Sequence, residues 1–172
     1  MSKLLAWLET SSRWSELRDL GQSNLVRASL LMPVFGYLLL TALLVGLAVP
    51  TFAVPRLGLS THLLGIMQGT FLMVVGALWP RLRLTRSTAQ VAFVLAIYGC
   101  VAAWTANLFA AIWGAGHSMV PIAAGAAHGS PIQERFISIA LRSAAVSLIA
   151  TAMLILWGLR GSRDSSATPG QE

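Results

Sequence analysis

Five polar or ionisable side chains lie inside long apolar stretches of the sequence, where chemistry is expected: His62, Gln68, Tyr98, Asn107 and Arg142. Placing such groups in an apolar environment costs free energy, so their presence there favours a functional role. An imidazole offers a nitrogen ligand for a metal, an amide orients a substrate, and a phenol exchanges a proton. The sequence contains no phosphate-binding loop, zinc-protease motif or hydrolase nucleophile elbow.

The sequence contains four apolar runs, at residues 29–49, 60–79, 88–114 and 136–157, and these runs must position the polar side chains. Each run has roughly 20 residues or more, which at about 1.5 Å per residue reaches across the ~30 Å of bilayer hydrocarbon. The runs are too long for lipid-spanning strands and lack strict alternation. The sequence therefore predicts an all-α integral membrane protein, a four-transmembrane-helix bundle whose second helix begins with an N-cap at Ser60 or Thr61.

Composition agrees with a membrane protein and sets the domain boundaries. Of the 172 residues 56% are hydrophobic and 10% are charged, whereas about a quarter of a soluble protein is charged. The net charge of +6 comes from basic residues scattered between apolar runs, so a nucleic-acid partner is not expected. We expect an amphipathic N-terminal segment at 1–27, with a solvated arm as the open alternative, followed by a four-helix transmembrane domain at 28–160 and a disordered tail at 161–172.

The distribution of Lys and Arg predicts the orientation in the membrane. With four spans, only Arg56 and Arg135 fall on one side and Arg142 falls inside the last span. The other side holds nine basic residues: Lys3, Arg13, Arg18, Arg27, Arg81, Arg83, Arg86, Arg160 and Arg163. This bias predicts that both termini are cytoplasmic, and that the loop carrying His117 and His128 faces outward.

Glycines share one face of the second span with its histidine. Gly65, Gly69 and Gly76 follow His62 by three, seven and fourteen residues, a spacing that aligns them on a helix. A stripe without side chains beneath a histidine is suited to a flat macrocycle whose metal the imidazole ligates. The same glycines form a GxxxG pattern, which favours close packing between helices. Both interpretations remain open from the sequence.

Depth along the spans suggests a substrate pocket. Gln68, Asn107 and Arg142 each fall roughly 9 to 12 Å inside the predicted outer ends of their spans, and His62 lies nearer the surface. Convergent polar groups in an apolar wall would hold a small aromatic substrate. Alternatively, Gln68 and Asn107 are interhelical hydrogen-bond partners, and Arg142 either extends its charged end to the membrane surface or pairs with Glu134.

The segment from Pro55 to Leu63 resembles the signature of hydroxylaminobenzene mutases. Further positions resemble the same family: Gly65, Gln68, Gly69, Phe71, Leu72, Gly76, Trp79, Pro80, residues 110–116 and residues 156–160. The resemblance covers about residues 28–160. It implies a mutase of the bacterial inner (cell) membrane that moves the hydroxyl of an aryl hydroxylamine from nitrogen to the ring, in nitroaromatic catabolism.

A more distant resemblance is to styrene oxide isomerases, four-helix membrane enzymes that bind haem b between the subunits of a trimer. It implies that His62 ligates haem iron acting as a Lewis acid, with Gly65 and Gly69 beside the macrocycle. Arg142 or Arg56 would pair with the haem propionates. A homotrimer in the lipid bilayer is therefore expected.

The resemblance also implies roles for the remaining polar side chains. Gln68 stands where these families commonly carry Asn and, with Asn107, would orient the small aromatic substrate, while Tyr98 would assist proton transfer. Three alternatives remain: isomerisation of an epoxide of the styrene oxide type, a non-enzymatic membrane cytochrome, and a small transporter or helical scaffold.

Overall fold

The computed structural model describes residues 26–160, and the predicted tail and nearly all of the predicted N-terminal segment lie outside this range. Within it, the chain forms four long helices that are long and apolar enough to cross a membrane, and no strand. The first helix spans Val26–Thr51 and ends in the 3-10 turn η1 (Val49–Thr51). Helix α2 spans Pro55–Leu78 and continues into the 3-10 turn η2 (Trp79–Arg81). Helix α3 spans Arg86–Trp113, and helix α5 spans Pro131–Arg160. The predicted all-α fold is confirmed.

The second helix begins earlier than its apolar run. Pro55 occupies the first turn of α2 after the extended residue Val54, a position where the missing N–H of proline costs nothing. Ser60 and Thr61 therefore lie inside the helix, and the Thr61 hydroxyl donates to the carbonyl oxygen of Leu57 at 2.8 Å. The expected N-cap at these two residues is wrong, because a hydropathy boundary marks the lipid boundary and not the helix start.

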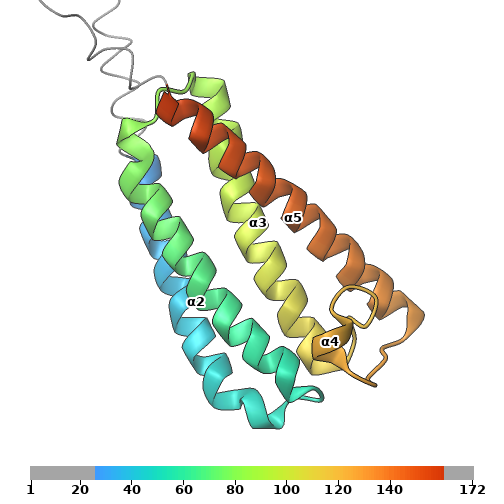
Figure 1. Ribbon diagram of the computed structural model, residues 1–172. Coiled ribbons are helices and arrows are strands. Elements are labelled where there is room, and N and C mark those ends of the chain that lie inside the picture. Colours follow the sequence, from blue (N-terminus) through green and yellow to red (C-terminus); the bar gives the residue numbers. More distant parts are fainter. Residues whose placement is uncertain (1–25, 161–172) are drawn as a thin grey trace, which may run out of the picture.

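Helix α3 is the centre of the bundle and packs against both α2 and α5 (Figure 1). The first helix, shown in blue to cyan, runs beside α2, and at Gly65 of α2 it meets Trp104 of α3. Fully buried Leu38, Leu72, Trp79 and Cys100 belong to one apolar core formed by the four helices. Helix α3 thus packs against both α2 and α5, and the first helix packs along α2.

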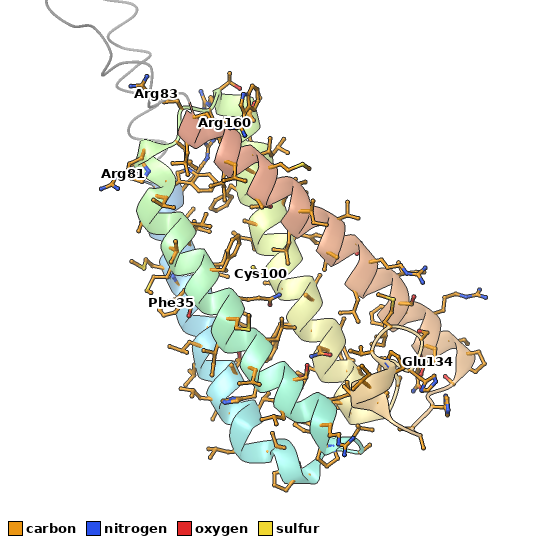
Figure 2. All side chains as sticks on the ribbon, in the orientation of Figure 1. Phe35, Arg81, Arg83, Cys100, Glu134 and Arg160 are labelled. Atoms are coloured by element: carbon orange, nitrogen blue, oxygen red, sulfur yellow. The ribbon has the colours of Figure 1, made fainter. Side chains whose placement is uncertain are left out.

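The two ends of the bundle differ in charge. Figure 2 shows Arg81, Arg83 and Arg160 together at one end, which we call the arginine end. Glu134 lies at the opposite end, the loop end, where residues 114–130 and the short helix α4 (Pro121–Ala124) connect α3 to α5. The clustering agrees with the predicted charge bias, while the side of the membrane that each end faces stays a prediction.

A single carboxylate organises the loop end. Glu134 accepts hydrogen bonds of 2.9 to 3.3 Å from five donors: the backbone N–H groups of Gly116, His117, Ser118 and Gly129, and the hydroxyl of Ser118. Ala115 and Ala124 of the loop are buried in an apolar cluster with α2, α3 and α5. The loop therefore folds back over the end of the bundle.

Candidate active site

The imidazole of His62 lies between α2 and the first helix. Its Nδ1 is 2.7 Å from the carbonyl oxygen of Ala42. The ring also packs directly on Gly46, since a Cβ added there would lie 2.6 Å from Nδ1. Ala42 and Gly46, one turn apart on the first helix, thus hold the ring from one side.

This contact fixes the tautomer of the neutral imidazole. A carbonyl oxygen only accepts, so Nδ1 carries the proton and donates it to Ala42, which leaves the lone pair on Nε2. Nε2 has no hydrogen-bond partner within residues 26–160, and it is not among the fully enclosed polar atoms. His62 therefore presents an accessible nitrogen ligand whose other nitrogen is bonded to a backbone carbonyl, the usual arrangement of a metal-binding histidine.

The glycine stripe of α2 is covered by the first helix along its length. A Cβ on Gly65 would lie 2.6 Å from both the Ala42 Cβ and the indole nitrogen of Trp104. A Cβ on Gly69 would lie 3.2 Å from the ring of Phe35, and one on Gly76 would lie 3.5 Å from Leu31. Side chains of the same chain therefore occupy the space that a flat macrocycle was expected to fill. Of the two interpretations left open by the sequence, the geometry matches close helix packing.

Gln68 lies on another face of α2, where a groove opens toward α5. The groove has a volume of about 270 Å³ and is lined by Gln68, Leu64, Met67, Phe71 and Leu148. The Gln68 side chain is 6% exposed, and its Oε1 is enclosed without a hydrogen-bond partner. An unpaired buried amide oxygen is costly in an apolar wall. The wall of the groove thus contains one amide oxygen that is enclosed and has no hydrogen-bond partner among the described residues.

Asn107 does not join Gln68. Its Nδ2 donates to the hydroxyl of Ser60 at 3.1 Å, which joins α3 to α2. Ser60 precedes Gln68 by eight residues, or about 12 Å along a helix. Asn107 therefore lies at the depth of Ser60, and the prediction that it meets Gln68 at one level is wrong. The early start of α2 explains the error, because depths were counted from Ser60 as a helix end.

Tyr98 and Arg142 also lie apart from Gln68. The Tyr98 hydroxyl is 2.8 Å from the Ser143 hydroxyl, and the tyrosine is 47% exposed on the seam between α3 and α5. The Arg142 side chain is exposed on α5, and the carboxylate of Glu134 is engaged by the loop amides. In the single chain, neither residue contributes to the groove at Gln68, so the predicted three-way convergence is not formed.

The residues fit a haem only in part. The Nε2 of His62 suits an axial iron ligand, but Gly65 and Gly69 contact the first helix and so do not form a cradle. A group ligated by His62 would have to occupy space outside that glycine stripe. Haem binding itself stays a prediction, with His62 as its ligand.

Two contributors were missed from the sequence. Gly46 supports the imidazole, and its signal was the Ala42–Gly46 spacing of two small residues one turn apart. Ser60 binds Asn107, but its position near the start of an apolar run made it look like a helix cap. Nothing in one sequence identifies which helix faces another, so these partners required the structure.

Comparison with known proteins gives consistent results. A family model described as styrene oxide isomerase matches residues 28–160. Hydroxylaminobenzene mutase HabB of Ectopseudomonas oleovorans is 46% identical over 125 residues, covering 73% of this chain and 76% of the relative. Hydroxylaminobenzene mutase HabA of the same organism is 38% identical over 122 residues, covering 71% and 90%. No solved structure matches.

Proposed function

Because this chain belongs to the styrene oxide isomerase family and is an isomerase, we propose that it rearranges an aryl hydroxylamine to an aminophenol. The observation that carries the proposal is the 46% identity to a protein named hydroxylaminobenzene mutase, over 76% of that protein's length. The apolar groove with one buried amide acceptor supports it, since an aryl hydroxylamine is a flat apolar ring with N–H and O–H donors. A role in bacterial nitroaromatic catabolism, in the inner membrane with cytoplasmic termini, belongs to the same proposal.

The reaction is redox-neutral and changes the position of one oxygen. The N–O bond breaks, a C–O bond forms on the ring, and the ring proton at that carbon is lost while nitrogen gains one. In the groove, Gln68 Oε1 accepts a hydrogen bond from the N–H or O–H of the substrate. Leu64, Phe71 and Leu148 pack on the ring and keep bulk water away from it.

We further propose that His62 holds haem b through Nε2, and that the Ala42 carbonyl keeps this nitrogen available. Ferric haem, when bound, would supply a Lewis acid for the hydroxylamine oxygen. His62 and Gln68 are six residues apart and thus about 120° apart around α2. A homotrimer, in which copies complete one another's sites, is therefore part of the proposal, and exposed Tyr98 and Arg142 are candidates for its contacts.

Turnover and absorption spectra of the purified protein in lipid nanodiscs test this function. Wild-type protein should convert phenylhydroxylamine to an aminophenol, measured by chromatography, and should show a Soret band. His62→Ala should lose both, while the loop variant His117→Ala should retain both. A His62→Ala protein with its Soret band intact would refute the ligand assignment. Absence of aminophenol from wild-type protein carrying its full chromophore would refute the mutase proposal.

Epoxide isomerisation is the second candidate, because the matching family model carries that name. Offering styrene oxide and phenylhydroxylamine to the same preparation distinguishes the two activities by their products. A membrane cytochrome would show a low-spin spectrum that added azide does not change. Within residues 26–160, His62 is the only histidine inside a helix, so we expect azide to bind.

A further inference from the structure

Two histidines meet at the loop end from either side of the short helix α4. The imidazole rings of His117 and His128 have their centroids 4.1 Å apart, with ring planes inclined by 50°. His117 is partly exposed and His128 is exposed, so a solute at the loop end can reach both rings. Neither ring lines the groove at Gln68. We call these two residues the loop histidines.

The carboxylate of Glu134 holds the backbone at both loop histidines. Its Oε1 accepts a hydrogen bond from the N–H of His117 at 3.3 Å, and another at 3.2 Å from the N–H of Gly129, the neighbour of His128. One oxygen therefore joins the two chain segments that carry the rings. Between these segments, Ala124 of α4 is buried in the apolar cluster of the loop end. The ring contact thus rests on a loop whose backbone is fixed on both sides of it.

A backbone carbonyl orients the first of the two rings. Nδ1 of His117 is 3.1 Å from the carbonyl oxygen of Gly125. Because a carbonyl oxygen only accepts, Nδ1 carries the proton of the neutral ring and the lone pair lies on Nε2. A histidine that binds a metal commonly donates its other ring N–H in this way. The ring of His128 is exposed and lies beside it, so a second nitrogen can turn toward the same ion.

The chemistry of the pair selects the class of ion. Neutral imidazole nitrogens bind divalent transition-metal ions such as Zn²⁺ and Cu²⁺, whereas Mg²⁺ and Ca²⁺ prefer oxygen ligands. Within residues 26–160, no third His, Cys, Asp or Glu joins the loop histidines in a metal-binding group. The oxygens of Glu134 are engaged by donors of the loop. Water would therefore complete the coordination, and two protein ligands imply a reversible site, since structural zinc sites use four.

We propose that His117 and His128 bind one divalent transition-metal ion, and that the bound ion holds the loop closed over the loop end. Nε2 of His117 supplies one ligand and a ring nitrogen of His128 supplies the other. The exposure of His128 allows the small separation of the rings that bonds of about 2.0 Å from zinc to nitrogen require. The ion would connect the segments before and after α4, and so oppose opening of the loop. This site is separate from His62 and from the proposed rearrangement.

The binding test uses calorimetric titration with Zn²⁺ alone, in phosphatidylcholine nanodiscs whose protein and scaffold carry no histidine tag. Wild-type protein should bind one ion per chain, and Mg²⁺ should not bind. His117→Ala and His128→Ala should each lower the affinity for Zn²⁺ by about tenfold or more, because the ion loses one of two linked ligands. His62→Ala, the matched control, should bind as wild type does. Equal binding by all three variants would show an adventitious ion only and would overturn the proposal.

Hydrogen exchange tests the effect of the ion on the loop. With Zn²⁺ at about 100 times its Kd, exchange of the amide protons of residues 116–129 should slow by up to about a hundredfold in wild-type protein. The same addition should leave exchange in His128→Ala unchanged, and circular dichroism without the ion should confirm that this variant is folded. Zn²⁺ binding that leaves loop exchange unchanged in wild-type protein would refute the closure of the loop. Both measurements are made without turnover, so their outcome is independent of the mutase proposal.

Discussion

The glycine stripe of α2 offers a graded test of how the first helix is held. The space for a Cβ differs between positions: 2.6 Å to the nearest side-chain atoms at Gly65, 3.2 Å at Gly69, and nothing within 4 Å at Gly36 of the first helix. Alanine at these sites adds one methyl group to each environment. Gly36→Ala is the matched control, because it carries the gain in helix propensity without a contact.

The expected magnitudes follow from the contact distances. Carbon atoms in contact prefer about 3.5 to 4.0 Å, so a methyl at Gly65 requires a shift of roughly 1 Å between α2 and the first helix. The Ala42 Cβ has no side-chain freedom with which to yield, so we expect a cost of about 2 to 3 kcal/mol, in the range of overpacked cores. Gly69→Ala should cost about 1 kcal/mol or less, because the Phe35 ring can move a few tenths of an ångström. Gly36→Ala should be neutral or stabilising by up to about 1 kcal/mol.

Equilibrium unfolding of each variant in detergent, followed by circular dichroism, measures this order. Absorption spectra of the same samples report any bound chromophore. Equal stability of Gly65→Ala and Gly36→Ala, together with a selective loss of the Soret band in Gly65→Ala, would refute the packing interpretation and restore these glycines as a cofactor surface.

Two other predictions concern hydrogen bonds at the loop end and between α2 and α3. Glu134→Gln replaces one acceptor oxygen with an NH₂ group, which would face the N–H donors of the loop. Hydrogen exchange of the amide protons of residues 116–118 should therefore accelerate by about one to two orders of magnitude, equivalent to about 1–3 kcal/mol. Arg135→Gln serves as the control, and unchanged exchange in Glu134→Gln would contradict the role of the carboxylate. Ser60→Ala and Asn107→Leu should each lower the free energy of unfolding, and the double variant should lower it by less than the sum of the two single effects. The expected difference is about 0.6 kcal/mol, which is typical of interhelical hydrogen bonds in membranes. Strictly additive effects in unfolding measurements would show that the hydrogen bond contributes nothing.

The spans were predictable because hydropathy over some twenty residues depends on the bilayer and hardly on tertiary contacts. The helix ends were less predictable than the spans. Helix α2 starts at Pro55 and α5 starts at Pro131, and each start precedes the apolar run of that helix. The difference of about one turn or more displaced the estimated depth of Gln68 relative to Asn107. An error confined to a helix boundary thus became an error in the composition of a site.

Single residues were predictable only where local chemistry decides their role. His62 was identified because an imidazole in an apolar run is unusual, and the structure gives it a carbonyl partner and a free nitrogen. The role of Gly65 depends on what packs against it. The same glycine spacing fits both a surface for a flat macrocycle and a close contact with another helix, so the sequence alone did not decide between them. Arg142 and Tyr98 are exposed and do not line the groove at Gln68, because the face that each residue occupies depends on how the helices pack.

The bond between His62 and Ala42 joins residues that are only 20 positions apart. Both belong to the first two helices, which form a hairpin closed by the short turn between Thr51 and Pro55. Because synthesis runs from the N-terminus, this hairpin is made before α5 is complete. The contact that orients the His62 imidazole is therefore internal to the first two helices, and it requires no residue of α3 or α5.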